Sequence, residues 1–235
     1  MRLDNYLVEN GFTDSRTKAQ NIIKNALVHV DGKVVKKSSY KVGEGDKVEV
    51  TKHKSFVSRS AHKLDKFLDE LELDITGFVA LDIGSSTGGF TQVLLERGVS
   101  EVSAVDVGKG QLHKTIKEDE RVHSYESCDI RKFESDKKFD LLTSDISFIS
   151  LHNVLDDVAR LASGFIILLF KPQFEVGREA KRDKNGVVLD KKMIQRAMIK
   201  FEDACRLKGW KLVLKSVSKL TGKEGNLEYC YCYEK

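Results

Sequence analysis

The chain of 235 residues contains no apolar run of about 18 residues, so we expect no membrane-spanning helix and no membrane partner. Its first residues, Met1 to Asn5, hold no apolar signal core, which argues against export. The four cysteines lack CxxC spacing, and Cys230 and Cys232 would share one face of a strand, which disfavours a bond between them. The six histidines show no metal-ligand spacing. These absences predict a reduced, cytoplasmic protein without a metal site.

Charge is abundant in the sequence but unevenly distributed. Residues 1–60 hold 12 Lys or Arg against 7 Asp or Glu, whereas the other 175 residues hold 28 against 29. The excess of positive charge therefore belongs to the N-terminal part of the chain. Such an asymmetry favours a polyanionic partner, above all nucleic acid. The alternative is a basic face that only meets solvent.

Residues 1–51 form a pattern of their own, with two short helical stretches followed by short apolar strands and an Asp31-Gly32 turn. This part resembles an S4 RNA-binding domain through its opening Arg2-Leu3-Asp4, its Ser15-Arg16 pair and the segment Val30 to Lys33. Position 25, commonly glycine in that family, is Asn, which tolerates the positive φ of a turn. The resemblance implies docking onto folded RNA through phosphates. The cations expected to make these contacts are Arg2, Arg16, Lys18 and Lys24.

A short basic linker is expected at residues 52–57, followed by a larger domain at residues 58–235. In the larger domain helical patterns alternate with short apolar strands, which indicates a mostly parallel sheet covered on both faces. Strands are expected at 78–83, 101–105, 139–143, 164–170, 210–217 and 227–233, and helices at 63–73, 87–97, 151–161 and 191–208. The last two strands are expected to form an antiparallel hairpin.

The segment Leu81 to Phe90 runs from an apolar strand through a glycine-rich turn into an amphipathic helix. Such a unit brings backbone N–H groups and a helix N-terminus close to a ligand. A dinucleotide-binding fingerprint would need glycine at 84, 86 and 89, but position 86 is Ser. The turn is instead similar to the S-adenosylmethionine-binding turn of class I methyltransferases, and Asp106 stands where doubly wound folds bind ribose hydroxyls. The residues expected to build this site are Asp82, Gly84, Ser85, Ser86, Gly88, Gly89, Phe90 and Asp106. A purely structural glycine turn is the alternative.

Two lysines and two carboxylates are candidates for the chemistry. Lys171 follows a buried type of strand and precedes Pro172, the only proline, which holds Lys171 in extended backbone at the carboxyl edge of the sheet. Asp145 follows another strand at the same edge. Lys63 begins the helix before the glycine-turn strand, and Glu228 lies in the last strand among apolar neighbours. For Lys171 the alternative is a side chain that merely reaches solvent.

In this chain order the four residues resemble the Lys-Asp-Lys-Glu tetrad of FtsJ-like ribose 2′-O-methyltransferases. Together with the S4-like part, nearly the whole chain resembles the TlyA (haemolysin A) family of rRNA methyltransferases. The segments that carry this resemblance are Ser58–Leu64, Leu81–Thr91, Ser144–Ser150, Phe170–Glu175 and Gly225–Tyr229. The resemblance implies an α/β fold: a Rossmann-like, mostly parallel seven-stranded sheet with an antiparallel last strand, preceded by the small α+β S4-like domain.

The same resemblance implies S-adenosylmethionine as cofactor, with Asp129 as the contact of its adenine amino group. It also implies 2′-O-methylation of cytidine in assembled ribosomal RNA by a protein for which we favour a monomer. The chain starts at the S4 motif and stops seven residues after Glu228, like the shorter form associated with large-subunit RNA alone.

Methyl transfer to a ribose hydroxyl needs a group that takes the hydroxyl proton. We expect Lys171 to do so in its neutral form, which partial burial and a second ammonium group, Lys63, favour. Asp145 and Glu228 are expected to orient the two ammonium groups, although their negative charge opposes the neutral form.

The charged segment between Pro172 and Asp190 is long for a loop in a compact domain. We expect it to be mobile and to close over the substrate ribose, with Arg178, Lys181 and Arg182 on phosphates. Arg59 is a further expected RNA contact. A solvated excursion without a role in catalysis is the alternative.

Three other functions compete with this interpretation. A nucleotide-binding oxidoreductase is disfavoured by Ser86 and by the absence of a substrate-domain pattern. A pore-forming haemolysin, which the family name suggests, needs a membrane-competent segment, and the apolar stretch at 164–170 is far too short. A non-catalytic RNA-binding or ribosome assembly factor would share the S4-like part but would not need Lys171.

Overall fold

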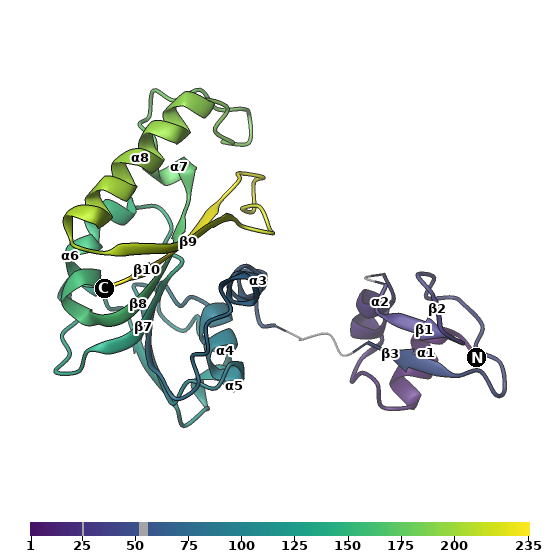
Figure 1. The fold of residues 1–235 in the computed structure, drawn as a ribbon. Helices are drawn as coiled ribbons and strands as arrows, with labels where there is room; N and C mark the ends of the chain where they lie inside the picture. Colours follow the sequence, from purple (N-terminus) through teal and green to yellow (C-terminus); the bar gives the residue numbers. More distant parts are fainter. Residues whose placement is uncertain (25, 52–55) are drawn as a thin grey trace. The chain divides into compact units, whose positions relative to one another are not determined.

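The computed structural model describes residues 1–24, 26–51 and 56–235, and the chain divides into two compact units, Met1–Ser55 and Phe56–Lys235 (Figure 1). Most of the expected linker at 52–57 lies outside the described residues, as does Asn25. Each unit has a hydrophobic core of its own.

In the N-terminal unit two helices pack against a three-stranded antiparallel sheet. The helices are α1 (Leu3–Glu9) and α2 (Arg16–Lys24), and the strands β1 (Val28–Val30), β2 (Lys33–Val34) and β3 (Val48–Val50) lie in the order β2-β1-β3. Ser15 Oγ accepts a hydrogen bond from the Lys18 N–H, as expected of the residue that caps α2. Asp31 and Gly32 have φ values of 49° and 73°, so the Asp-Gly pair forms the predicted two-residue hairpin turn.

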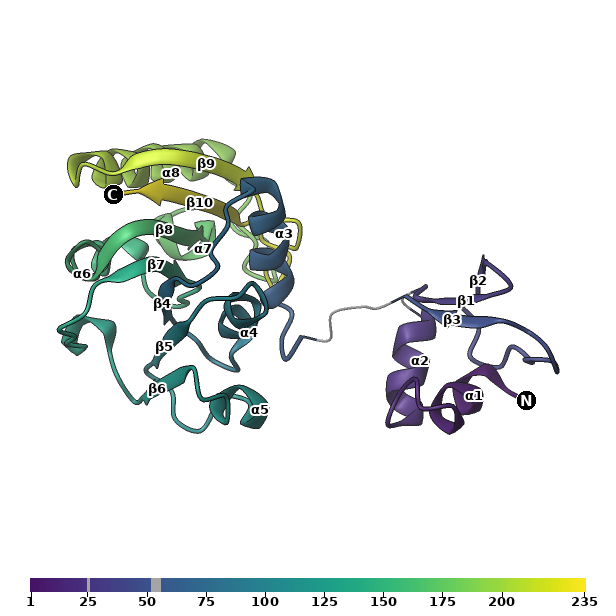
Figure 2. The same ribbon diagram turned by 60° about the horizontal axis from the view of Figure 1, so that its bottom comes forward.

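A seven-stranded sheet forms the centre of the larger unit (Figure 2). Its strands are β4 (Val79–Ile83), β5 (Glu101–Asp106), β6 (Val122–Glu126), β7 (Phe139–Ser144), β8 (Ala162–Phe170), β9 (Lys211–Val217) and β10 (Tyr229–Glu234). They lie in the order β6-β5-β4-β7-β8-β10-β9, and all neighbours from β6 to β8 are parallel. The last strand, β10, is antiparallel to both β8 and β9, which confirms the predicted sheet. The order reverses at β4, and ligands of open α/β sheets bind beyond the strand ends at such a point.

Helices cover both faces of this sheet (Figures 1 and 2). On one face lie α3 (Ala61–Leu71), α4 (Gly89–Glu96) and the short α5 (Lys114–Lys117), and on the other lie α6 (Leu155–Leu161) and α8 (Lys191–Leu207). The remaining single turns are α7 (Pro172–Glu175), η1 (Ile130–Lys132) and η2 (Leu151–Asn153).

Alternate residues of each strand serve the two faces of the sheet. In β8, Leu168 and Phe170 pack on the α6 and α8 side, whereas Ile167 and Leu169 pack on the α3 and α4 side. Lys171 continues the strand in extended backbone, with φ −116° and ψ 102°, as its position before proline predicts. Its side chain therefore falls on the same side as Leu169, which is the side of α3.

The structure corrects several expected boundaries. The helix expected at 151–161 is two elements, η2 and α6, separated at Val154. Helix α3 begins at Ala61, before Lys63, and ends at Leu71, after which Glu72 adopts a left-handed conformation with φ 52°. Glu228 lies one residue before β10 rather than within the strand. Periodicity locates an element, but its ends depend on local capping contacts that the pattern does not record.

Candidate active site

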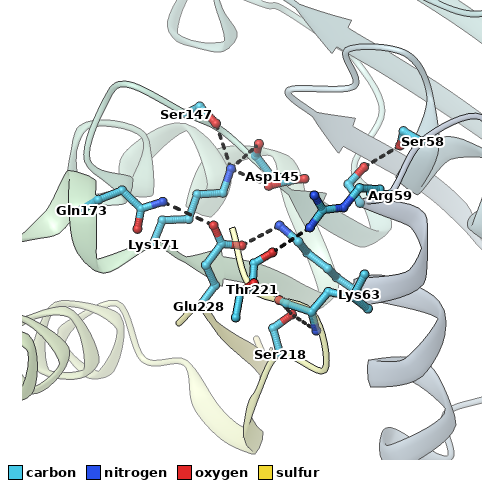
Figure 3. Close-up of polar contacts among 12 residues, drawn as sticks. Ser58, Arg59, Lys63, Asp145, Ser147, Lys171, Gln173, Ser218, Thr221 and Glu228 are labelled. Carbon is cyan, nitrogen blue, oxygen red and sulfur yellow. Dashed lines mark hydrogen bonds and ion pairs between the residues drawn. The ribbon is translucent and has the colours of Figure 1, made fainter. Parts of the chain in front are cut away.

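Two largely buried lysine–carboxylate pairs meet at the carboxyl edge of the sheet (Figure 3). Lys63 Nζ lies 2.5 Å from Glu228 Oε2, and Lys171 Nζ lies 2.6 Å from Asp145 Oδ1. The first turn of α3 supplies Lys63, and the ends of the adjacent strands β7 and β8 supply Asp145 and Lys171. Glu228 joins them because β10 runs antiparallel to β8, which brings the start of β10 to the end of β8.

Further polar atoms surround these pairs. Lys171 Nζ also donates hydrogen bonds to Ser147 Oγ (2.8 Å) and to the Asp145 carbonyl oxygen (3.1 Å), in addition to its ion pair with the Asp145 carboxylate. Gln173 Nε2 donates to Glu228 Oε1 at 3.3 Å. Burial of a charged side chain is costly unless an opposite charge and hydrogen bonds compensate it. Two positive and two negative groups achieve that compensation here.

A cavity of about 520 Å³ opens beside the two pairs. Lys63, Asp145 and Lys171 line it. Glu228 does not line it, so its carboxylate binds Lys63 on the side away from the cavity. The rest of the lining comes from the glycine turn and from three other segments, namely Ser58, Arg59, Ser60, Gly84, Ser85, Ser86, Thr87, Phe90, Ser147, Thr221 and Lys223. The cavity is thus a space in which a substrate atom can reach both lysines.

A second cavity, of about 510 Å³, lies on the other side of the glycine turn and shares Gly84, Ser86, Asp145 and Ser147 with the first. The carboxylates of Asp106 and Asp129 line it, together with apolar side chains that include Val107, Ile130 and Ile149. Ligand sites of roughly 300–1,000 Å³ with apolar walls and a few placed polar groups are typical for small molecules. Among the residues expected at the cofactor site, Gly84, Ser86, Asp106 and Asp129 line this cavity, and Ser85 and Phe90 line the first.

Gly84 and Ser86 in the glycine turn have left-handed backbone. Gly84 has φ 78°, and a Cβ there would lie 3.3 Å from the backbone of Ile146. Ser86 has φ 46°, and its N–H donates to Asp106 Oδ2 at 2.8 Å. The other oxygen of Asp106 accepts from the Gly108 N–H at 2.6 Å. These bonds fix the carboxylate of Asp106 in the wall of the second cavity.

Asp129 is held in a similar way. Its side chain caps η1 by accepting from the Arg131 N–H, and the Arg131 guanidinium forms an ion pair with it. The side-chain hydrogen bonds from Arg131 lower the pKa of Asp129 to about 2. A permanently ionised carboxylate beside the apolar wall suits an adenine amino group, so the lining fits the adenosine part of S-adenosylmethionine.

Three expected cofactor residues line neither cavity. Asp82 is fully buried beneath the turn, where it accepts hydrogen bonds from Thr91 Oγ1 (2.7 Å) and Thr143 Oγ1 (3.0 Å). A Cβ at Gly88 would lie 2.8 Å from Leu112 Cδ1, and a Cβ at Gly89 would lie 2.0 Å from Ser58 Oγ. These three positions therefore serve the packing of the turn.

The expected RNA contacts of the N-terminal unit are organised around Asp4. Its carboxylate is fully buried and accepts hydrogen bonds from Arg2, from Arg16 Nε (3.0 Å) and from Gln20 (3.1 Å). The Arg2 side chain is 43% exposed and the Arg16 side chain 56%, so both guanidinium groups also reach the surface.

The other two expected RNA contacts of this unit are surface lysines. Lys18 is exposed and pairs with Asp14 at 2.6 Å, and Lys24 is exposed as well. In the larger unit the exposed Arg59 lines the first cavity, and its guanidinium donates to the Thr221 carbonyl at 3.3 Å. Arg59 therefore stands beside the two lysines.

The charged segment after Pro172 has structure of its own. Val176, Ala180 and Val188 form a small buried cluster against α8, and Arg182 pairs with Val188 in an isolated bridge. The Arg182 guanidinium donates to the carbonyls of Gly177, Arg178 and Ala180, so this side chain organises the loop. Arg178 and Lys181 are exposed.

Several residues at the ion pairs and the first cavity were not predicted from the sequence. Ser147, Gln173 and Glu175 hold the two pairs or the loop beside them, and Thr221 and Lys223 line the first cavity. Ser147, Gln173 and Glu175 do lie in segments that carry the family resemblance, which was the available signal. In the described part of the chain, no group of three or more His, Cys, Asp or Glu is arranged for a metal, and no helix is long and apolar enough to cross a membrane.

Comparison with known proteins extends this picture. Residues 56–235 match the family described as FtsJ-like methyltransferase, and residues 1–48 match the S4 domain. The chain is 42% identical to a protein from Campylobacter jejuni named 23S rRNA (cytidine-2′-O)-methyltransferase TlyA, over 100% of both chains. It is 37% identical to a protein from Mycobacterium tuberculosis named 16S/23S rRNA (cytidine-2′-O)-methyltransferase TlyA, over 97% of this chain and 87% of that one.

A solved structure of a protein from Streptococcus thermophilus, named as a hemolysin, superposes with a TM-score of 0.73 at 31% identity, over 100% of this chain and 88% of that one. The matches cover both units and the segments that carry the two ion pairs. The chain belongs to the TlyA (hemolysin A) family, in which it joins an S4 domain to an FtsJ-like methyltransferase domain.

Proposed function

We propose that this protein transfers a methyl group from S-adenosylmethionine to the ribose 2′-hydroxyl of a cytidine in ribosomal RNA. The observation that carries the proposal is the convergence of the two lysine–carboxylate pairs beside the first cavity, next to Gly84, Ser86, Asp145 and Ser147, which both cavities share. One cavity fits the adenosine part of the cofactor, and the other lets a nucleotide approach Lys63 and Lys171. The names of relatives at 42% and 37% identity support the ribose and cytidine assignments.

Bound S-adenosylmethionine would supply an electrophilic methyl group, held by the glycine turn, Asp106 and Asp129. Lys171 Nζ takes the proton of the 2′-hydroxyl as the oxygen attacks. The Asp145 carbonyl and Ser147 Oγ then accept hydrogen bonds from the resulting ammonium, and the Asp145 carboxylate forms an ion pair with it. These acceptors stabilise the product of proton transfer, and Lys63, held by Glu228, places a second positive charge beside the reacting oxygen.

For the RNA, the proposal assigns binding to exposed cations on both units. They are Arg2, Arg16, Lys18 and Lys24 in the N-terminal unit and Arg59, Arg178 and Lys181 in the larger one, with Arg182 shaping the loop that carries the last two. Large-subunit RNA is the proposed substrate, because the Campylobacter jejuni relative, matched over both full lengths, is named for 23S rRNA alone. Small-subunit RNA is the alternative that the experiment must include.

The test is mass-spectrometric mapping of ribose methylation in both ribosomal RNAs, with and without the gene. We expect one cytidine to lose its 2′-O-methyl group in the large-subunit RNA when the gene is absent, and to regain it with the wild-type gene but not with Lys171→Met. In vitro, Lys171→Met should lower kcat by about 10²–10⁴-fold, the range for loss of a general base. Its affinity for S-adenosylmethionine should remain unchanged by calorimetry, and the exposed Lys66→Met is the control.

Normal methylation with Lys171→Met would contradict the assigned chemistry. An unmodified cytidine that persists with the wild-type gene, together with retained binding to ribosomal subunits, would instead indicate a non-catalytic assembly factor.

A further inference from the structure

The one-turn helix α7 begins directly after Lys171, and two of its side chains bind to one ion pair and to the loop beside the other. Gln173, one residue into the turn, donates from Nε2 to Glu228 Oε1, the oxygen that Lys63 does not use (Figure 3). Pro172 at the first helical position fixes the direction in which the turn leaves the strand. Gln173 therefore links the turn that follows Lys171 to the carboxylate that holds Lys63.

Glu175 makes the second link, to the loop that follows Asp145. Its Oε2 accepts from Ser150 Oγ at 2.6 Å, and its Oε1 accepts from the Leu151 N–H at 2.8 Å. Burial of this carboxyl raises its pKa, so its position is costly unless both oxygens are hydrogen-bonded. A half-buried carboxylate with both oxygens bound to one loop indicates that the loop is held in place.

The loop between Asp145 and Ser150 is strained, which explains why it needs to be held. Phe148 is not glycine but has φ 71°, a conformation that persists only when its surroundings impose it. Phe174 lies between Gln173 and Glu175 in α7, and its ring packs against the Phe148 ring with 5.5 Å between the ring centroids. Ser147, which accepts from Lys171, is the residue immediately before the strained position. A shift of this loop would therefore move two acceptors of Lys171 Nζ.

We propose that Gln173 and Glu175 are positioning residues that make α7 a brace between the two ion pairs. Gln173 keeps Glu228 against Lys63, and Glu175 keeps Ser147 and the Asp145 carbonyl against Lys171. Neither side chain lines the cavity beside the lysines, so both act through other residues. This inference rests on the proposed methyl transfer and adds two residues to its machinery.

The first test uses Glu175→Ala and Glu175→Gln in the full-length protein, with unmodified ribosomal subunits and tritium-labelled S-adenosylmethionine. Because a displacement of about 1 Å at a reacting group can cost roughly 100-fold in rate, we expect Glu175→Ala to lower kcat roughly tenfold to 100-fold. Because Ser147, Phe148 and Ile149 also line the second cavity, the KM for S-adenosylmethionine is expected to rise as well, so the rate is compared as kcat at saturating S-adenosylmethionine. Glu175→Gln keeps an oxygen acceptor and should recover most of the rate, a rescue that a general loss of folding would not give.

The second test is a double-mutant cycle with Ser147→Ala. If Glu175 acts through the loop, the losses in kcat from Glu175→Ala and Ser147→Ala are not additive, because the same acceptor is displaced in both variants. The exposed Glu179→Ala, in the same loop region, is the control and should leave kcat unchanged. Wild-type kcat in Glu175→Ala, or additive losses in the cycle, would overturn the role of Glu175.

Gln173→Leu provides an independent measurement if Glu175→Ala fails to fold. The leucine keeps most of the volume but cannot donate to Glu228, and we expect a roughly tenfold loss in kcat without a change in the KM for S-adenosylmethionine. Wild-type kcat in this variant would overturn the brace. A fully active Lys171→Met enzyme, in contrast, would remove the proposed function itself, so the two failures are distinguishable.

Discussion

At the scale of single residues, the site matches each buried positive charge with a negative one. Lys63 and Glu228 are less than a tenth exposed, as is Lys171, and each lysine lies within hydrogen-bonding distance of its carboxylate. Removal of one member of such a pair leaves an uncompensated buried charge, which typically costs about 3–5 kcal/mol. The four side chains therefore act as a unit, and the effect of any one substitution includes its partner.

Asp82 provides a residue-scale prediction about pH. Burial raises the pKa of this carboxyl to about 6, above the ordinary value of 3.8. Between these two values the native protein holds a proton that the unfolded chain has lost, so stability falls as the pH rises from about 4 to about 6 and is then level. The difference between the two pKa values corresponds to about 3 kcal/mol.

Asp82→Asn should remove this contribution. We expect the free energy of unfolding of the wild type, minus that of Asp82→Asn, to decrease by up to about 3 kcal/mol between about pH 4 and pH 7. Urea denaturation at a series of pH values measures it. Parallel stability curves for the two proteins would show that Asp82 ionises in the native state as it does in the unfolded chain.

At the scale of elements, the glycine turn combines two demands that fall on different residues. Gly84 and Ser86 line both cavities, whereas Gly88 supplies a left-handed backbone at the start of α4 and a close contact with Leu112 and Ile116. The same glycine-rich pattern in the sequence thus serves ligand approach at one end and helix packing at the other.

Comparison of Gly88→Ala with Gly110→Ala separates the effect of a steric clash from the effect of a side chain at positive φ. Both glycines have positive φ, 91° and 67°, but a Cβ at Gly88 would lie 2.8 Å from Leu112 Cδ1, whereas a Cβ at Gly110 meets nothing within 4 Å. We expect Gly88→Ala to destabilise the protein by roughly 1–3 kcal/mol more than Gly110→Ala, the usual cost of overpacking. Urea denaturation of both variants at neutral pH checks this, and equal losses would contradict the packing role.

At the scale of the whole molecule, RNA affinity is proposed to come largely from the basic N-terminal unit. Arg16 is a poor choice for charge reversal, because its Nε is bound to the buried Asp4 and a new carboxylate there would disturb the fold. Lys18 and Lys24 are exposed, so their replacement changes charge with little effect on the core.

We therefore expect the double variant Lys18→Gln, Lys24→Gln to bind ribosomal RNA more weakly and with a flatter salt dependence. Each lost phosphate contact should reduce the slope of log affinity against log salt by about 0.7–0.9, because fewer counterions are released. Filter binding over a salt series measures the slope, and calorimetry should find the affinity for S-adenosylmethionine unchanged. Lys211→Gln, on β9 of the other unit, is the control. If Lys211→Gln flattened the salt dependence as much as the double variant does, the assignment of RNA binding to Lys18 and Lys24 would be refuted.

Six of the seven strands of the larger unit, its longer helices, the antiparallel last strand and the chain positions of Lys63, Asp145, Lys171 and Glu228 could be predicted from the sequence, whereas the short elements β6 and α5 could not. The periodicity of apolar residues predicts strands and helices, and the carboxyl ends of parallel strands meet at one edge of the sheet. The proline after Lys171 likewise fixed its extended backbone in advance. These features depend on residues that are neighbours in the chain.

Only the tertiary structure decided which side chains touch. Lys63 and Glu228 are 165 positions apart in the chain, and Glu175 and Ser150, which share a hydrogen bond, are 25 positions apart. The structure also shows that Asp82 is buried and that Gly88 and Gly89 lie close to neighbouring side chains, whereas their predicted place at the cofactor site stays a prediction. Hydrogen bonds and van der Waals contacts are set by distances of a few ångströms, and those distances exist only once the sheet has brought remote segments together.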